Sequence, residues 1–452
     1  MASKPLWKHQ KESLAFFDKV ACGFDFSDPG TGKTRVQIES FNNCKTRKRM
    51  LVVSPKTLMQ AAWGDDIEQY APQLTVSYAN AGKRLDGFTI NTDVVIINTD
   101  GVKELTDKAF HKMLSNFSHV VIDESTAFKN PQAQRSNAMN KVIKNFTHRR
   151  LLTGTPTPNT VMELFYPTLL LDGGRRLGTS YVALRNKIQV PTQIGPDANH
   201  LRWDDSPGAG QAVREIIGDI AVRHAFEDVM SHVPANYRET KHFTLSKTAQ
   251  RHYDTMLQNC VLALDDVNIT AVHAAAMRTK LLQIASGAVY TGGEDSEYAI
   301  IDSQRYELIT ELVEARAHSV VFFNWKHQRE LLSEAFTKRG ISFALIDGSV
   351  KPADRNKIVA DYQAGKYQTL LLHPKTGAHG LTLTRGTTTI VSSPIYEADM
   401  LKQMIHRIYR GGQTQVTNTI FVEAKNTVER KVYERLDGKY TRMTDFMQML
   451  TE

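Results

Sequence analysis

Cysteines are few and far apart in this chain. Its 452 residues include only Cys22, Cys44 and Cys260, and no CxxC or Cys/His motif surrounds them. Structural zinc sites and disulfide frameworks normally show such spacings. We therefore expect neither zinc nor a disulfide framework, which is consistent with a reducing cytosol.

Long apolar segments are also missing. The first ten residues, MASKPLWKHQ, have no apolar core of the kind that a secretory signal requires. No apolar run approaches the length of a membrane span, and the sequence shows neither solenoid repeats nor low-complexity tracts. These absences argue against a secreted, a membrane-spanning or a repeat protein, and we expect a cytoplasmic one.

Acidic residues are outnumbered by basic ones. The chain has 56 Lys and Arg against 48 Asp and Glu, which gives a formal net charge of +8. This excess suits a polyanionic partner such as nucleic acid, although many basic proteins bind none. Hydrophobic residues make up 41% of the chain, enough for the cores of two or three domains.

Short β-branched runs alternate with longer helical patterns in two parts of the chain. The runs lack polar alternation, which indicates burial on both faces and hence parallel sheets covered by helices. In the first part, strands are expected at 51–54, 93–98, 119–123 and 150–154. In the second, they are expected at 319–323, 342–346, 369–372 and 388–393. The pattern predicts an α/β protein with two parallel-sheet units.

The two parts are separated by a stretch rich in Gly and Pro. Between Asp172 and Gly210 the segments DGGRRLG, VPTQIGPD and DDSPGAG predict irregular structure and a domain connection. We expect a strand at 243–245 and helices at 247–261, 269–286 and 428–450. The expected division is an N-terminal lobe 1–171, a connection and linker 172–240 and a C-terminal lobe 241–452.

The stretch SDPGTGKT, Ser27–Thr34, lies between a strand-like FDFS and a helical KTRVQIESF. Strand, glycine-rich loop, Lys-Thr and helix is the context of a phosphate-binding loop, although a chance match is the alternative. Backbone N–H groups around Gly30–Gly32 would face phosphates at the helix N-terminus. Lys33 would reach the β- and γ-phosphates, and the Thr34 hydroxyl would coordinate Mg²⁺. The expected nucleotide-binding residues of this loop are Pro29, Gly30, Thr31, Gly32, Lys33 and Thr34.

Two carboxylates end an apolar strand in VVIDEST. Asp123 would hold the Mg²⁺, and Glu124 would polarise the attacking water. In a parallel sheet, the carboxyl end of this strand would place both residues beside the phosphate loop. An ordinary acidic turn is the alternative when the motif is taken alone, but the loop some ninety residues earlier strengthens the catalytic interpretation.

Several further motifs follow one another over nearly the whole chain. They are PLWKHQKESLAFF, LVVSPKTLMQAAW, VIDESTAFKN, RLLTGTPTPN, VRHAFEDVMSHVP, VVFFNW, LIDGS, PKTGAHGLTLT and QMIHRIYRGGQ. In this order they resemble the superfamily-two helicases, specifically the Swi/Snf-like group of DNA-dependent ATPases. The resemblance implies two RecA-like parallel-sheet lobes with an ATP cleft between them.

The resemblance also implies roles for individual residues. Gln10 would contact the purine edge of adenine, since an amide can both donate and accept. Contacts to the nucleic-acid backbone are implied for Ser54, Pro55, Lys56, Lys129, Asn130, Asn159, Thr376, Gly377 and Gly380. The segment Gln403–Gln413 resembles the arginine-finger motif, which implies catalytic roles for Gln403, Arg407 and Arg410. Arg407 and Arg410 are three residues apart and are expected to share a helix face.

Four positions depart from the family pattern. Ser27 stands where relatives have Ala or Gly, and Thr126 where they often have His. His406 replaces a common Gly, and His379 interrupts a glycine cluster. None of these changes removes a group on which the chemistry depends.

The resemblance implies an ATP- and Mg²⁺-dependent translocase on DNA without sequence preference. Forked or branched DNA, or DNA carrying bound protein, would be its substrate. The chain is close to minimal and has no room for the large insertions of chromatin remodellers, so a compact motor from a phage or bacterium is expected. An RNA helicase on the same two-lobe core and a nucleic-acid-binding protein with an inactive motor remain alternatives.

The Gly/Pro-rich stretch suggests a second hypothesis. Arg185, Lys187, Arg202 and Trp203 mix basic and aromatic side chains there. Such a mixture can recognise branched DNA, with Trp203 stacking on an exposed base. A surface connector whose Trp packs on a neighbouring helix is the alternative.

Overall fold

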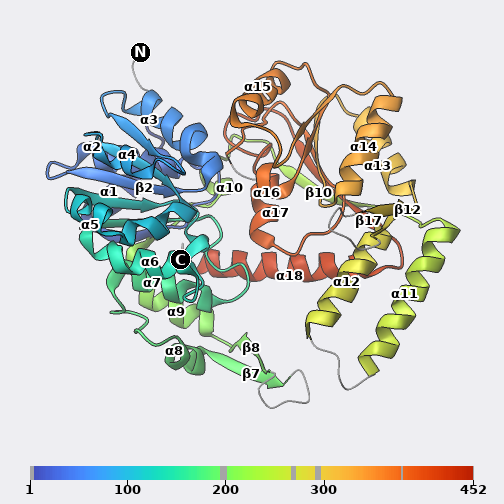
Figure 1. Cartoon of the computed structure of the whole chain (residues 1–452), viewed down its shortest axis with the longest axis horizontal. Helices are drawn as coiled ribbons and strands as arrows, with labels where there is room; N and C mark the ends of the chain where they lie inside the picture. Colours follow the sequence, from blue (N-terminus) through green and yellow to red (C-terminus); the bar gives the residue numbers. More distant parts are fainter. Residues whose placement is uncertain (1–4, 194–200, 266–270, 291–296, 378–379, 451–452) are drawn as a thin grey trace. The chain divides into compact units, whose positions relative to one another are not determined.

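The computed structural model describes residues 5–193, 201–265, 271–290, 297–377 and 380–450. The chain divides into two compact units (Figure 1). Unit 1 comprises residues 1–231 and 439–452, and unit 2 comprises residues 232–438. Within the described residues, no helix combines the length and apolar character needed to cross a membrane.

Unit 1 contains a sheet of seven parallel strands in the order β3-β4-β2-β5-β6-β1-β9. The strands are β1 (Cys22–Asp25), β2 (Arg49–Ser54), β3 (Val76–Ala79), β4 (Val94–Asn98), β5 (Phe117–Ile122), β6 (His148–Leu152) and β9 (Ala221–Val222). The helices are α1 (Lys8–Lys19), α2 (Lys33–Asn43), α3 (Asp65–Tyr70), α4 (Arg84–Thr89), α5 (Lys108–Leu114), α6 (Gln134–Val142), α7 (Phe165–Asp172), α8 (Tyr181–Ile188), α9 (Ala209–Ile217) and α10 (Phe226–Val229).

The central strands of unit 1 are buried on both faces. In β2, Leu51 and Val53 belong to one hydrophobic core, whereas Met50 and Val52 belong to the core on the other face. Successive side chains of a strand point to opposite faces. The uninterrupted apolar runs of the sequence are therefore the consequence of two cores on one sheet, as predicted for a parallel α/β unit.

Unit 2, like unit 1, contains a parallel sheet, here of six strands in the order β10-β17-β16-β13-β15-β14. The strands of this sheet are β10 (Asn236–Phe243), β13 (Ser319–Phe322), β14 (Phe343–Ile346), β15 (Thr369–Leu372), β16 (Thr388–Val391) and β17 (Thr417–Ala424). Strands β11 (Ala288–Tyr290) and β12 (Tyr298–Ile300) pair with each other in a separate antiparallel sheet. The helices are α11 (Lys247–Asp265), α12 (Ala271–Ala285), α13 (Gln304–Glu314), α14 (Lys326–Lys338), α15 (Pro352–Gln363), α16 (Pro374–Gly377), α17 (Ala398–Ile405) and α18 (Val428–Met449). The predicted α/β class with two parallel-sheet units is confirmed.

The stretch 172–210 is more regular than its composition suggests. Besides the end of α7 it forms α8 and an antiparallel hairpin of β7 (Gln189–Gln193) and β8 (Leu201–Asp205), drawn at the margin of unit 1 in Figure 1. The predicted irregular structure is found at 173–180 and 206–208 but not at 181–193 and 201–205, where glycines and prolines punctuate short elements instead of preventing them, and residues 194–200 lie outside the described residues. Residues 172–231 lie within unit 1, so they do not form a separate connection.

The last turns of α18 also belong to unit 1. Met443, Phe446 and Met447 are buried in the same core as β2 and β5. The Nε of Arg214 in α9 donates a 2.7 Å hydrogen bond to the carbonyl oxygen of Met449. The chain therefore returns to unit 1 after completing unit 2.

Candidate functional site

The glycine-rich loop joins the end of β1 to the start of α2. Gly30 and Gly32 have φ angles of 86° and 83°, in the left-handed region that favours glycine. A Cβ on Gly32 would lie 2.2 Å from Nε2 of Gln10. The backbone conformation therefore requires glycine at position 32, and a larger residue there would also displace the amide of Gln10.

The side chain of Lys33 turns back into this loop. Its Nζ donates hydrogen bonds to the carbonyl oxygens of Ser27 at 2.6 Å and Asp28 at 3.2 Å. The Thr31 hydroxyl donates to the carbonyl oxygen of Asp28 at 2.8 Å and closes the loop on itself. An ammonium group thus lies inside a glycine-rich turn at the N-terminus of α2, where Thr34 is the second helical residue. This arrangement suits an anionic group, because the first N–H groups of a helix lack intrahelical partners.

Ser27, one of the four residues that depart from the family pattern, fastens the loop to a distant segment. Its Oγ accepts a hydrogen bond from the N–H of His224 at 3.1 Å. Oδ2 of the adjacent Asp28 accepts one from the N–H of Phe226 at 3.0 Å. These bonds hold the loop against the segment that follows β9, so Ser27 has a structural use and leaves the glycines and Lys33 undisturbed.

Gln10 and His9 of α1 lie directly against the loop. Oε1 of Gln10 accepts a hydrogen bond from the N–H of Trp7 at 3.0 Å, and its Nε2 donates to the carbonyl oxygen of Thr31 at 3.5 Å. A ring nitrogen of His9 lies 2.8 Å from the same carbonyl oxygen. The predicted adenine-contacting residue is thus next to the loop, and its contact with a purine remains a prediction.

Asp123 follows β5 at the same edge of the sheet as the loop. Strand β6 pairs with both β5 and β1, so the carboxyl ends of all three strands meet. Oδ2 of Asp123 accepts a 3.0 Å hydrogen bond from Nε1 of Trp63, and Oδ1 accepts one from the N–H of Glu124 at 3.1 Å. Burial raises the pKa of Asp123, while the Trp63 hydrogen bond and the charge of Lys33 act in the opposite direction. The structure thus places the predicted carboxylate at the same edge of the sheet as the loop that holds Lys33.

Glu124 has an unusual backbone conformation. Its φ angle is 51°, and Glu124 and Asn426 are the two non-glycine residues with positive φ among the described residues. Such a conformation costs energy and occurs often at functional sites. Glu124 is partly exposed, whereas the adjacent Asp123 is buried.

Trp63 is a site residue that sequence reasoning missed. It lies in a short π-helix, η2 (Met59–Gly64), and is fully buried. Single π-helical turns occur frequently at functional sites. The sequence signal was its place in the motif LVVSPKTLMQAAW, but nothing local shows that its indole faces a carboxylate sixty residues later.

Two predicted nucleic-acid contacts are brought together by one glutamate. Oε1 of Glu163 accepts hydrogen bonds from Nζ of Lys129 at 2.7 Å and Nδ2 of Asn159 at 2.9 Å. Oε2 of Glu163 accepts a third from the N–H of Asn159 at 3.0 Å. Glu163 therefore orients both residues. Asn130 is exposed beside them, and its Oδ1 accepts a bond from the N–H of Gln132 at 2.9 Å.

Ser54 does not fit the role predicted for it. Its side chain is fully buried and its Oγ donates to the carbonyl oxygen of Pro55 at 3.4 Å. A direct contact with a phosphate is therefore excluded in this conformation. Lys56 is exposed and Pro55 is half-buried, so these two residues present the motif to solvent.

In unit 2, Arg407 and Arg410 converge on one carbonyl oxygen. Nη1 of Arg407 and Nη1 of Arg410 donate to Leu381 at 3.2 and 2.9 Å. The prediction that they share a helix face is wrong, because α17 ends at Ile405 and both residues lie in the turn that follows. The shared Leu381 carbonyl, rather than helical spacing, keeps them adjacent. Nε of Arg407 also donates to the carbonyl oxygen of Gln403 at 2.8 Å.

Other predicted residues of unit 2 lie around the short helix α16. Thr376 is partly exposed and Gly377 is buried. A Cβ on Gly377 would lie 2.8 Å from Cβ of Leu372, so the close approach of the chain requires glycine. Gly380 has a φ angle of 71°, and His379 lies outside the described residues.

Two family models match this chain. The SNF2-related domain matches residues 9–288, and the helicase conserved C-terminal domain matches residues 304–412. Together they cover most of both units.

Relatives of different lengths match nearly the whole chain. The phage protein "Putative protein p41" from Acyrthosiphon pisum secondary endosymbiont phage 1 is 28% identical over 91% of this chain and 91% of its own length. The putative ATP-dependent helicase/translocase YwqA of Bacillus subtilis is 24% identical over 97% of this chain, but the match spans only 48% of YwqA. Human ZRANB3, a DNA annealing helicase and endonuclease, is 23% identical over 91% of this chain and 37% of its own length.

A solved structure is similar over a comparable extent. The Sulfolobus solfataricus SWI2/SNF2 ATPase core in complex with dsDNA has 21% sequence identity and a TM-score of 0.45. The similarity covers 98% of this chain and 93% of that chain.

Proposed function

Since the chain belongs to the SNF2-related family of superfamily-two helicases, we propose that it is a DNA-dependent ATPase that moves along duplex DNA. The observation that carries the proposal is that the glycine-rich loop, with Lys33 bonded inside it, and Asp123 lie at the same carboxyl edge of one parallel sheet. A glycine-rich loop, a lysine and a buried carboxylate at the carboxyl edge of a parallel sheet are the parts that phosphoryl transfer requires.

The residues of unit 1 fit ATP with Mg²⁺. The N–H groups around Gly30–Gly32 would hold the phosphates, and Lys33 would exchange its bonds to Ser27 and Asp28 for phosphate oxygens. Thr34 and Asp123 would hold Mg²⁺, which supplies positive charge against the phosphates when bound. Glu124 would orient the attacking water and accept its proton, consistent with its exposed position beside the buried Asp123.

Unit 2 would complete the catalytic groups. Arg407 and Arg410 would stabilise the negative charge that develops on the transferred phosphoryl group. Gln403 would support them, because its carbonyl oxygen accepts from Arg407 and its own Oε1 is buried without a partner among the described residues. We propose that ATP binds between the two lobes and that hydrolysis drives a cycle of closing and opening.

Contacts with DNA would run along the phosphate backbone. Lys56, Lys129, Asn130 and Asn159 would supply them from unit 1, and Thr376, Gly377 and Gly380 from unit 2. Contacts of this kind carry no sequence information and permit movement along the duplex. Binding should therefore be independent of sequence and weaken strongly as salt is raised.

We further propose that branched or forked DNA, or DNA with bound protein, is the working substrate. The name of ZRANB3 records DNA annealing and endonuclease activities for that relative, which supports a substrate with single- and double-stranded parts. The present chain matches 37% of ZRANB3, so only the motor portion can be shared.

Steady-state ATP hydrolysis is the first test. It should be measured without nucleic acid and with single-stranded DNA, linear duplex, a four-way junction and RNA, at two salt concentrations. Stimulation by duplex, and most by the junction, would support the proposal. Equal rates with and without DNA would overturn it, and stimulation by RNA alone would favour an RNA helicase.

The Lys33→Ala variant is the catalytic control. It should fold and keep its affinity for DNA but lose turnover, since removing Lys33 removes the positive charge from the loop. Turnover that persists in this variant would indicate a contaminating ATPase. A wild-type chain that binds DNA without turnover would support the inactive-motor alternative.

A further inference from the structure

Three metal-ligating side chains meet in unit 1, away from the nucleotide site. They are Cys44, directly after α2, His119 in β5 and His148 at the start of β6, and one ligand atom of each lies within 4.8 Å of the others. Strands β5 and β6 are parallel and pair His119 with His148. The cluster therefore lies toward the amino-terminal edge of the sheet, whereas Asp123 follows the carboxyl end of β5.

The hydrogen bonds of His148 determine which of its nitrogens is free. The hydroxyl of Thr147 donates its only proton to the carbonyl oxygen of Ser118 at 3.0 Å. That hydroxyl also lies 3.0 Å from Nδ1 of His148, and while its proton is on the Ser118 carbonyl it accepts there, which favours a proton on Nδ1. In a neutral imidazole, Nε2 then has a free lone pair, which is the form that binds a metal.

His119 is held in a similar way. Its Nδ1 lies 2.8 Å from Oγ of Ser118, and its ring is stacked on that of His148 with 4.1 Å between centroids and 4° between planes. When one ring nitrogen of a histidine binds a metal, the other usually makes a hydrogen bond to a neighbouring group, which fixes the orientation of the ring.

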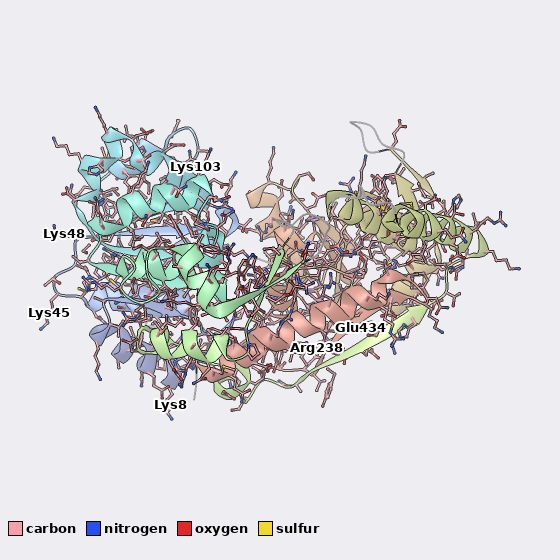
Figure 2. All side chains as sticks on the ribbon, turned by 90° about the horizontal axis from the view of Figure 1, so that it is seen from below. Lys8, Lys45, Lys48, Lys103, Arg238 and Glu434 are labelled. Carbon is pink, nitrogen blue, oxygen red and sulfur yellow. The ribbon has the colours of Figure 1, made fainter. Side chains whose placement is uncertain are left out.

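The third ligand is close to solvent. Cys44 is partly exposed, and its Sγ lies 3.6 Å from the hydroxyl of Thr46. Figure 2 shows Lys45 and Lys48 on the same margin of unit 1. These neighbouring cations oppose a second positive charge. A thiolate would offset half the charge of a divalent ion.

We propose that Cys44, His119 and His148 bind one Zn²⁺ ion, with water as the fourth ligand. Thiolate and imidazole suit Zn²⁺, and three protein ligands plus water is an established tetrahedral set. Because the two imidazole planes are parallel and stacked, the rings must rotate out of this arrangement before the lone pairs of both Nε2 atoms can point at one ion. Local spacing argues against zinc here, but the three ligands come from segments that meet only in the folded chain.

Such an ion would join three elements that lead to the nucleotide site. Helix α2 begins at Lys33 and ends next to Cys44, and its 11 residues span about 16 Å. Strand β5 runs from the cluster toward Asp123. Zn²⁺ would therefore fasten the far ends of the elements that carry the loop lysine and the carboxylate, and it would stabilise unit 1 independently of any nucleotide.

The test uses the full chain after removal of metals with a chelator. Zn²⁺ binding is measured by competition with a chromophoric chelator, and Co²⁺ is used as a spectroscopic substitute. The wild type should bind one equivalent of Zn²⁺, show a thiolate-to-cobalt charge-transfer band and unfold at a higher temperature with Zn²⁺. Cys44→Ser should abolish the charge-transfer band. Cys44→Ser and His148→Ala should each lower the affinity for Zn²⁺ by more than about 100-fold, because loss of a residue that only hydrogen-bonds to a metal ligand already lowers it by about 10- to 100-fold.

Cys22→Ser and Cys260→Ser are the matched controls. Cys22 is also a partly exposed free cysteine, but its Sγ lies 3.7 Å from the carbonyl oxygen of Thr147 and is not part of the cluster. Both control variants should still bind one equivalent of Zn²⁺ and show the thiolate-to-cobalt charge-transfer band. The proposal is overturned if the wild type binds no Zn²⁺ above the level of Cys44→Ser, or if a control loses the signal equally. Circular dichroism of each metal-free variant checks that it is folded. His148→Ala removes a second proposed ligand and so tests the site independently of Cys44→Ser.

Discussion

The indole Nε1 of Trp63 donates a 3.0 Å hydrogen bond to Oδ2 of Asp123, and both side chains are buried. This bond holds the carboxylate at the end of β5 in one orientation. Its other oxygen accepts from the backbone N–H of Glu124. The position of the carboxylate proposed to hold Mg²⁺ is thus set by a tryptophan from another motif.

Trp63→Phe should impair catalysis more than it alters the fold. The variant keeps an aromatic ring but removes the donor to Asp123, which should destabilise the chain by about 1–3 kcal/mol. Loss of an outer-shell partner should also reduce activity or apparent Mg²⁺ affinity by about 10- to 100-fold. Mg²⁺ titrations of ATP hydrolysis measure this change. Trp325→Phe, at a half-buried tryptophan of unit 2, is the control; an unchanged Mg²⁺ dependence in Trp63→Phe would contradict the prediction.

Arg410→Ala should abolish most of the stimulated hydrolysis while leaving DNA binding intact. Arg410 is partly exposed whereas Arg407 is buried, so Arg410 is the more accessible of the pair. Arginine fingers typically contribute at least about 10³-fold to the rate. The measurement is kcat and KM for ATP with saturating duplex. Arg430→Ala removes an exposed arginine that pairs with Glu434 and should have little effect; a rate within about twofold of wild type for Arg410→Ala would refute its catalytic role.

Trp203→Ala tests whether the β7–β8 hairpin recognises branched DNA. The Arg185 guanidinium lies 3.9 Å from the centroid of the Trp203 ring, so α8 covers part of this tryptophan. If the ring also stacks on a base, its loss should weaken junction binding by about fivefold or more relative to linear duplex. Trp203→Phe, which keeps a stacking face, should restore most of the preference. If Trp203→Ala folds and binds the junction as tightly as the wild type, Trp203 only packs against α8 and does not recognise branched DNA.

Unit 2 should lose stability as pH falls from about 6.5 to 4. Nε2 of the buried His327 lies 2.7 Å from Ser286 Oγ, and its Nδ1 lies 3.0 Å from Tyr290 Oη. Burial and the charge of Arg305 lower its pKa to about 4, against the opposing effects of Ser286 and Glu330. The unfolded chain therefore binds more protons in this window, and stability present above pH 6.5 is lost as the pH falls.

The size of this effect follows from the change in pKa. The pKa of His327 is about 2.5 lower in the folded chain than its ordinary value, so the free energy of unfolding should fall by about 3 kcal/mol across the full pH window. Urea unfolding at pH 7 and pH 5 measures the loss, and His327→Gln should flatten it because glutamine does not titrate. Equal pH dependence in the wild type and the variant would show that other groups dominate.

Much of the fold was predictable because its signals are local. The runs around Leu51, Val95 and Val120 are apolar without interruption, and each forms a strand buried on both faces. The stretch 172–210 was less predictable, since its glycines and prolines do not reveal whether short elements pair between them. The hairpin forms there through cross-strand pairing, for instance of Pro191 with Trp203.

The candidate site divides in the same way. The sequence alone determined the α/β class, the glycine-rich loop with Lys33, and the carboxylates Asp123 and Glu124, because apolar runs and glycine conformations act over a few residues. Only the tertiary structure decided that Trp63 orients Asp123, that Leu381 holds the two arginines together, and that Cys44 meets two histidines. These relationships join residues that are distant in the chain, and strand order and packing rather than local spacing place their polar atoms within hydrogen-bonding or ligand distance.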